Sequence, residues 1–393
     1  MANAAGVRQD KVRFIVGDLE STVGTFQYAS VFTSPYSPSG SELRLPARAE
    51  SRFIPTDAEK IDNSEALDGY AGAIASTRGA IGMGGTLVTE LRANSVTNVY
   101  PTHVKHLLAS GFEVSDYTGP AVTLIPSTKA LTNWPGESAA VGPDGTGTDA
   151  GKRYPASMSL VECLIDNNTA DEWTGIRGAV LATKITLGTN GLVLYTSEIT
   201  GLVYNNLILD VSDTDLSGFG AEPTGQGIDP IVVKGATLVV KYVDGSTTSP
   251  SPTTITPSRI RNLEIDLAPN IIRIEDPTAD EGFAVSPVFY DGAIGVTLEM
   301  ADEADYDGGI TAGTIMAGMK SGRGFLSIEL TLTLDSSFSV DQTIKYELPR
   351  IQYDAERANA DGARAFTVTG QAVRPERGSS DNMITVTYTH GTA

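Results

Sequence analysis

The word GAIG occurs twice in the chain, in "RGAIGMGGTLVTEL" (78–91) and in "DGAIGVTLEM" (291–300). Each copy leads into a β-branched, apolar segment typical of a strand. Each strand is followed by a helix-like segment that ends on a Ser-Gly pair, at 110–111 and at 321–322, at nearly the same distance from GAIG. Ordered matches at similar spacing are much less expected by chance than one repeated word, so we predict an ancient tandem duplication.

Further matches continue the two copies in the same order. "SLVE" (159–162) corresponds to "LSIE" (326–329), and "GLVLYTSEITG" (191–201) corresponds to "ARAFTVTGQAV" (363–373). The lead-in "SRFIPTDAEKID" also has a counterpart in "SRIRNLEIDL". These matches predict an N-terminal arm (1–50), a first repeated domain (51–210) with a loop insertion near 120–155, a linker region (211–258) and a second repeated domain (259–393).

Short alternating segments predict a mainly β fold. In "FLSIELTLTLD" (325–335) the leucines share one face, while Glu329, Thr331 and Thr333 share the other. The pair Asn190-Gly191 predicts a type I′ turn that folds two strands back as a hairpin. The expected fold is two tandem β-sandwich or barrel domains, each with one flanking α-helix, plus long loop arms.

Composition narrows the function. The 393 residues include 48 acidic and 28 basic side chains, for a formal charge of −20, which opposes binding to the nucleic-acid backbone. No apolar run is long enough to span a bilayer, and "MANAAGVRQDKVRF" lacks the apolar stretch of a signal peptide. The single cysteine, Cys163, stands in "SLVECLID" and is expected to be a small buried hydrophobe.

Few residues suit catalysis or metal binding. Of three histidines, His103 and His106 lie in "HVKH" and could share a helix face, but no third ligand accompanies them, so an ordinary helix surface is expected. "EADYDGGITAGT" (303–314) imitates a calcium loop but has Thr314 where the bidentate Glu belongs, so an acidic turn is expected. We predict no enzyme activity, no cofactor and no metal site.

Three segments rich in Gly, Pro, Ser and Thr interrupt these patterns, at 31–50, 133–155 and 244–258. They hold few large apolar residues and cannot build cores of their own. We interpret them as linkers, or as arms that become ordered only against a partner.

The repeated pattern resembles the major tail tube proteins of long-tailed bacteriophages. The resemblance rests on "STRGAIGMGGTLVTEL" followed by "THVKHLLASGF", and on "DGAIGVTLEM", "GFLSIELTLTL" and "ARAFTVTGQAV" in the second half. It implies stacked rings whose inner sheets join into a continuous β-barrel around a bore for DNA. Six tube domains make an ordinary ring, so a chain with two of them implies a homotrimer ring.

The resemblance also implies partners and location. These would be further copies of the chain, a tape measure protein, a tail terminator and baseplate or tip proteins, in a virion tail assembled in the host cytoplasm. DNA would pass through the lumen during ejection without specific binding. Glu329, Thr331 and Thr333 are expected to face that lumen, because hydroxyl and carboxylate side chains offer phosphate no cation.

The alternative is a stand-alone β-sandwich binding module, recognising a receptor or a carbohydrate on a virion or cell surface. Such a module would need exposed aromatic residues on a loop or groove. The two tryptophans, Trp134 and Trp173, lie in Gly/Pro-rich or polar settings, which favours the tube.

Overall fold

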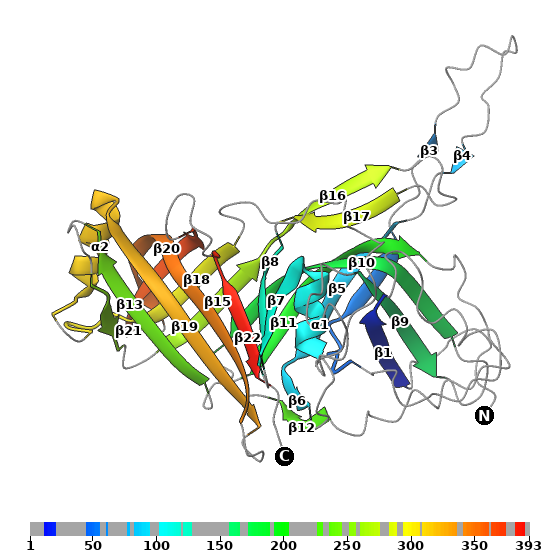
Figure 1. The fold of residues 1–393 in the computed structure, drawn as a ribbon, viewed down its shortest axis with the longest axis horizontal. Coiled ribbons are helices and arrows are strands. Elements are labelled where there is room, and N and C mark those ends of the chain that lie inside the picture. The colour runs from blue at the N-terminus through cyan, green and yellow to red at the C-terminus, as the bar shows by residue number, and fades with distance from the viewer. Residues whose placement is uncertain are drawn as a thin grey trace, which may run out of the picture.

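In the part of the chain that it describes, the computed structural model is mainly β, with one large antiparallel sheet and two short helices (Figure 1). The mainly β class is as the sequence predicts, whereas the arrangement as two separate tandem domains stays a prediction. Within the described residues the large sheet is 16-stranded, and three two-stranded sheets accompany it. The structure describes residues 12–20, 45–55, 60–61, 77–78, 82–94, 102–118, 121–127, 157–165, 172–188, 192–203, 226–230, 236–245, 251–256, 260–275, 283–288, 294–306, 309–335, 341–360, 363–374 and 382–389.

The elements fall into a first half, up to β11, and a second half, from β13 onward. The first half contains β1 (Val12–Leu19), β2 (Arg52–Pro55), β3 (Lys60–Ile61), β4 (Thr77–Arg78), β5 (Gly82–Glu90), β6 (Arg92–Asn94), α1 (Thr102–Ala109), β7 (Phe112–Thr118), β8 (Ala121–Pro126), β9 (Met158–Ile165), β10 (Glu172–Leu187) and β11 (Val193–Val203). After β12 (Gln226–Pro230), the second half contains β13 (Ala236–Asp244), β14 (Thr253–Ile255), β15 (Ile260–Leu267), β16 (Asn270–Glu275), β17 (Phe283–Val288), β18 (Ile294–Ala301), α2 (Ala312–Ser321), β19 (Gly324–Asp335), β20 (Gln342–Ala360), β21 (Ala363–Ala372) and β22 (Thr385–Thr389).

The two halves have the same pairing order. In the first half the strands pair in the order β2–β5–β11–β10–β9–β1. In the second half the order is β15–β18–β21–β20–β19–β13. The helices and hairpins keep this correspondence along the chain, because β3–β4 precedes β5 and α1 as β16–β17 precedes β18 and α2.

The long strands β10 and β20 each serve two sets of partners. The first part of β10 pairs with β9, its register shifts between Arg177 and Val180, and its second part pairs with β11. Likewise β20 pairs first with β19 and then with β21. A glycine on the neighbouring strand, Gly201 on β11 and Gly370 on β21, lies close to each long strand. A Cβ on Gly201 would lie 2.8 Å from Ile176 Cγ2, and one on Gly370 would lie 2.9 Å from Ile351 Cγ2. Both positions therefore exclude a larger side chain.

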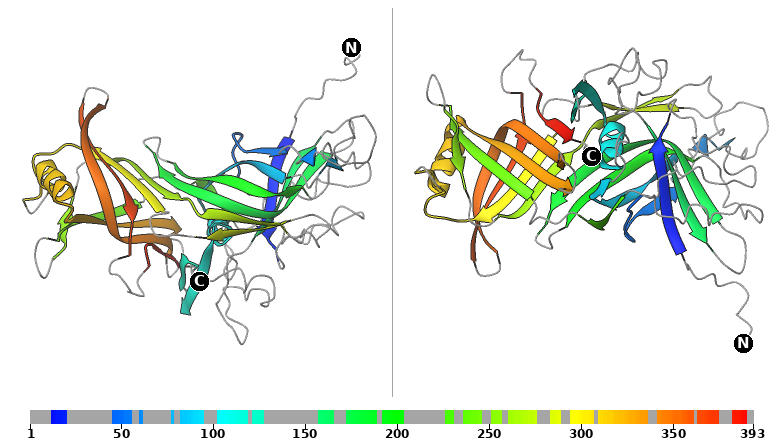
Figure 2. Two further views of the ribbon diagram at one scale, coloured as in Figure 1. Left: turned by 90° about the horizontal axis from the view of Figure 1, so that it is seen from above. Right: turned by 60° about the horizontal axis from the view of Figure 1, so that its bottom comes forward.

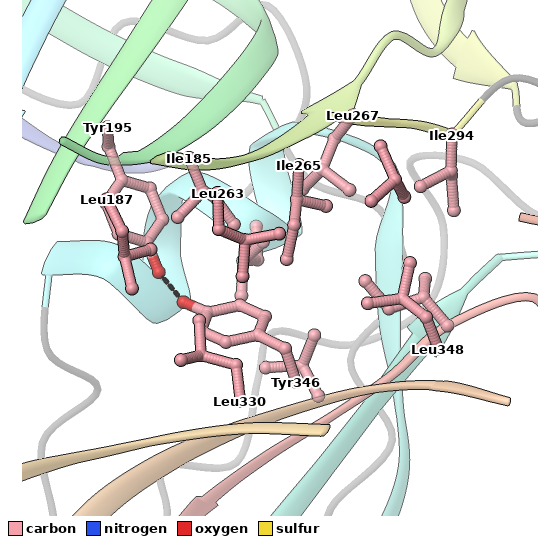
Figure 3. Close-up of a cluster of buried hydrophobic side chains, with 14 of the residues drawn as sticks. Ile185, Leu187, Tyr195, Leu263, Ile265, Leu267, Ile294, Leu330, Tyr346 and Leu348 are labelled. Atoms are coloured by element: carbon pink, nitrogen blue, oxygen red, sulfur yellow. Dashed lines mark hydrogen bonds between the residues drawn. The ribbon is translucent and has the colours of Figure 1, made fainter. Parts of the chain in front are cut away.

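One hydrophobic core runs between two layers of strands and through both halves. Figure 3 shows Tyr195 and Leu263, from β11 and β15, facing Leu330 and Tyr346, from β19 and β20. The hydroxyls of Tyr195 and Tyr346 hydrogen-bond to each other across the gap between the layers. The two halves are thus joined by a shared core as well as by the sheet.

The two helices have matching ends. Ser110 directly follows α1, and its Oγ donates to the carbonyl of His106 at 2.8 Å. Ser321 is the last residue of α2, and its Oγ donates to the carbonyl of Gly318 at 2.8 Å. A left-handed glycine follows in each case, with φ 93° at Gly111 and 64° at Gly322. Both predicted Ser-Gly helix ends are confirmed. Figure 2 shows that α2 lies at one end of the long axis, while α1 lies nearer the middle.

Other predictions have mixed outcomes. The hairpin of β10 and β11 is confirmed, but its turn at 190–191 lies outside the described residues, as do 31–44 and 133–155. The region 211–258, predicted as a linker, contains β13 and β14, and their side chains Val240 and Ile255 are buried in the core. The alternation of "TLVVKYV" favours that strand, although its polar surroundings resemble a linker. The domain limits themselves stay a prediction.

Candidate assembly surface

The first polar surface is the one predicted from β19. Glu329, Thr331 and Thr333 all lie on the half-exposed face of β19, and the leucines between them are buried. Cross-strand neighbours extend this surface over β13, β20 and β22. We call it the β19 face; it comprises Thr237, Val239, Glu329, Thr331, Thr333, Thr343, Lys345, Glu347, Thr385, Thr387 and Thr389.

The β19 face carries a cation that β19 alone does not reveal. Lys345 on β20 stands directly opposite Thr331, with its Nζ 2.8 Å from Glu347 Oε1 and 3.3 Å from Glu329 Oε2. Burial opposes the charged form of Lys345, but the hydrogen bonds and charges of Glu347 and Glu329 outweigh that effect and raise its pKa. The cation is therefore held between two carboxylates.

A second polar surface covers the opposite layer of the sheet, formed by β11, β10, β15, β18, β21 and the second part of β20. Its side chains are mainly threonines and carboxylates. We call it the acidic face; it comprises Lys184, Thr186, Thr196, Glu198, Glu264, Asp266, Thr297, Glu299, Asp354, Glu356, Thr367 and Thr369.

Lys184 is enclosed by acids in the middle of the acidic face. Its Nζ lies 2.9 Å from Glu264 Oε1 and 3.9 Å from Asp266 Oδ2. The hydrogen bond to Glu264 raises the pKa of Lys184. Burial raises the pKa of Asp266, and Lys184 only partly offsets this. The surrounding charge remains negative, so this surface would repel a polyanion.

The acidic face crosses the junction between the two halves. Thr183–Leu187 of β10 pair antiparallel with Leu263–Leu267 of β15. We call this pairing the internal junction. It joins the two halves edge to edge into one continuous sheet.

Among the described residues several strands have one partner each, including β1, β7 and β14. Two further edges lie at positions equivalent to the strands of the internal junction. Strand β2 pairs only with β5, and residues 352–360 of β20 pair only with β21. On β2, Ile54 is 55% exposed, more than any other large apolar side chain in the described part of the chain. Open edges of this kind are pairing sites for a further strand.

The predicted helix-surface position of the two histidines is wrong. His103 and His106 are buried in the core, and the His103 ring lies 5.6 Å from that of Tyr388 and 6.3 Å from that of Tyr195. The layers of both halves meet over this side of α1, which local periodicity could not reveal. Within the described ranges, no group of three potential metal ligands occurs.

Burial also determines how the histidines respond to acid. It lowers the pKa of His103 to about 3, with a smaller contribution from His106, and lowers the pKa of His106 to about 4, with a contribution from Lys105. His103 Nε2 and both ring nitrogens of His106 have no hydrogen-bond partner in the described structure. Both rings are therefore neutral at pH 7.

Acid should destabilise the fold through these residues. The folded-state pKa values lie below the unfolded value of 6.5, so the stability is present above pH 6.5 and is lost as the pH falls toward about 4. At pH 5 the expected loss is about 2 kcal/mol per histidine. Urea unfolding at pH 7 and pH 5 measures it. The double variant His103→Leu, His106→Leu should lose much less stability between the two pH values; an unchanged loss would contradict the assignment.

The acidic segment imitating a calcium loop is organised around a tyrosine. Tyr306 is buried, and its hydroxyl donates to the carbonyl of Ala301 at 2.8 Å. Its backbone N–H donates to the carbonyl of Ile310 at 2.7 Å.

Cys163 is buried in β9, as its apolar run predicts. None of the described helices is long and apolar enough to cross a membrane.

Comparison with known proteins does not identify a family for this chain. No family model and no curated protein matches the chain. Among solved structures, part of the chain is similar to a chain from the cryo-EM structure of the anti-feeding prophage (AFP) baseplate, 6-fold symmetrised. The match covers 34% of this chain and 87% of that chain at 13% identity, with a TM-score of 0.20. At that score we draw no conclusion from it about fold or function.

Proposed function

We propose that the chain is a structural subunit of a phage tail, the major tail tube protein, which self-assembles into stacked rings that form the hollow conduit for DNA ejection. The observation that carries this proposal is the internal junction. Two halves with the same strand order are paired edge to edge, and the equivalent strands at the other side of each half, β2 and the end of β20, have one partner each among the described residues.

Open edges at both ends of a repeated unit favour head-to-tail assembly. A heterologous contact of this kind closes into a ring when its rotation permits, and otherwise continues as a filament. Ring closure also removes the exposed edges, which are otherwise aggregation-prone. With two similar units in each chain, a ring of six units contains three chains.

The polar surfaces support a conduit for DNA. Walls rich in threonine and carboxylate hold phosphate weakly, and the lysines on both faces are enclosed by acids. The lumen position of Glu329, Thr331 and Thr333 stays a prediction. The acidic face is the stronger candidate, because its strands continue through the internal junction, whereas β19 branches away through β13 and β14.

The wider assembly follows from the same proposal. Copies of this chain would stack along the virion tail, with a tape measure protein inside and terminator and baseplate or tip proteins at the ends. A stand-alone binding module would leave the matching open edges without a role.

Counting the chains in each ring tests the proposal. Native mass spectrometry and class averages of tube cross-sections should give three chains per ring with pseudo-sixfold symmetry. Six chains per ring would contradict the duplication. Protein that remains monomeric at high concentration would contradict the tube and favour the binding module.

A further inference from the structure

We propose that β20 of one copy pairs antiparallel with β2 of the next copy, with Ala360 opposite Ile54, in the register of the internal junction. This inference rests on the proposed ring. It names the two edges that meet and the residues that face each other. The two halves pair their strands in the same order, so the open edges are equivalent to the edges that meet at the internal junction.

Two glycines fix which residues correspond. Ile199-Thr200-Gly201 on β11 and Val368-Thr369-Gly370 on β21 have similar sequences. A Cβ on Gly201 would lie 3.0 Å from the carbonyl oxygen of Arg177, and one on Gly370 would lie 2.4 Å from that of Gln352. The same backbone approach, from the equivalent long strand, makes Gly201 equivalent to Gly370.

A separate sequence match gives the same alignment. Gly201 pairs with Met83 on β5, and Gly370 pairs with Val296 on β18. Met83 and Val296 are the residues that directly follow the two GAIG words. The sequence repeat and the strand pairing therefore agree without any shift.

The register of the internal junction can then be transferred to the open edges. On β5 and β18, Gly84 pairs with Ile54 and Thr297 pairs with Glu264, so Ile54 is equivalent to Glu264. On the long strands, Val180 pairs with Thr200 and Asp354 pairs with Thr369, which makes position 360 equivalent to position 186. Since Thr186 pairs with Glu264 inside the chain, Ala360 should pair with Ile54 of the neighbour.

The open end of β20 begins at a position equivalent to the start of the internal junction on β10. In the first half, Ser110 after α1 hydrogen-bonds to Thr183 at 2.7 Å, beside the start of the internal junction. In the second half, Met319 of α2 accepts the backbone N–H of Ala355 at 3.0 Å, just before the open stretch 357–360. Each helix thus packs beside its long strand and leaves the next residues available for a further strand.

The internal junction and the proposed junction between copies, which we call the seam, differ in their side chains. At the internal junction, Lys184 bridges Glu264 and Asp266. At the open edges Ala358 replaces Lys184, and Ile54 replaces Glu264. The exposed Ile54 would lose contact with water when β20 of the neighbour arrives. An apolar seam also explains why a large aliphatic side chain is left exposed on an edge strand, where charged residues are usual.

A disulfide across the seam tests the register. In a Cys163→Ser background, Ile54→Cys and Ala360→Cys in the same chain should be oxidised in assembled tubes to covalently closed trimers, seen on a non-reducing gel. The matched control pairs Ile54→Cys with Asn359→Cys, one residue out of register and on the other face of the strand. It should give at least tenfold less cross-linked product.

The outcomes separate this inference from the ring itself. Tubes that form without cross-linking at 54 and 360 would overturn the register and leave the tube intact. Cross-linking within monomers would overturn it as well, since the edges would then belong to one chain. Failure of the unmodified protein to assemble would reject the proposed function and the inference together.

A charge substitution gives a second test that does not depend on cysteine chemistry. Ile54→Lys should reduce tube yield at least tenfold while the subunit keeps its unfolding midpoint. Ile260→Lys is the matched control, because Ile260 is also exposed, at 38%, but lies outside the paired part of β15 at the internal junction. It should assemble normally. Normal assembly of Ile54→Lys would contradict the seam.

Discussion

In assembled tubes, a cysteine at position 297 should react with a small maleimide and stay unmodified by a maleimide attached to a polymer wider than the bore. Thr297 lies in the middle of the acidic face, on β18, and is half-buried in the subunit. If the strands on both sides of the internal junction surround the lumen, this position is reached only through the tube ends. The experiment uses Thr297→Cys in a Cys163→Ser background, with both reagents also applied to the free subunit.

The comparison variant is Thr331→Cys on the β19 face, which is likewise half-buried on a regular strand. Fast labelling of position 331 and protection of position 297 from the bulky reagent would place the bore at the acidic face. The opposite pattern would confirm the lumen assignment of Glu329, Thr331 and Thr333. If the bulky reagent labels both positions at the free-subunit rate, neither face lines a lumen and the tube proposal fails.

Tyr346→Ala should lower the free energy of unfolding by about 3–5 kcal/mol, as expected for truncating a large aromatic in a core. Tyr346 is fully buried and meets Tyr195 between the two layers (Figure 3). The variant leaves a cavity where the halves join and removes the partner of the Tyr195 hydroxyl. Urea unfolding at pH 7 measures the effect, and a loss below about 1 kcal/mol would contradict the core position.

The hydroxyl pair can be separated from the packing by a double-mutant cycle. Tyr346→Phe alone leaves the Tyr195 hydroxyl buried without its partner and should cost about 1–3 kcal/mol. Burial already raises the pKa of Tyr195 well above its usual range, so the phenol remains protonated at the pH of the experiment. Replacing both tyrosines with phenylalanine should restore most of the loss, because no polar group is then left unpaired.

The sequence predicted best those features that depend on residues close together in the chain. The alternation in β19 predicted its buried and polar faces, and the Ser-Gly pairs predicted both helix ends. Side chains of a strand alternate every two residues, and a helix often ends at a glycine in the left-handed conformation, so both features can be predicted from a short window of sequence. The repeated words predicted a tandem duplication but gave no strand order, which comes from the pairing registers.

Contacts between distant segments were not predicted. Lys345 and Thr331 lie on different strands, so no local sequence pattern could show that they stand opposite each other. Only the pairing register of β19 and β20 brings them together. The histidines of α1 were expected on a surface because helical spacing cannot say which layers cover the helix. The internal junction depends on the same long-range pairing.

The internal junction would have a consequence for the assembly of the proposed ring. A junction made within one polypeptide forms at the effective concentration set by its linker, in the millimolar range for a short flexible tether, whatever the amount of protein in the cell. In a three-chain ring every second junction would thus be sealed before any two molecules meet. If the proposed ring forms, joining two units in one chain would also let them diverge, as the ionic internal junction and the proposed apolar junction would illustrate. A divergent pair could then present extensions around a ring with threefold rather than sixfold spacing.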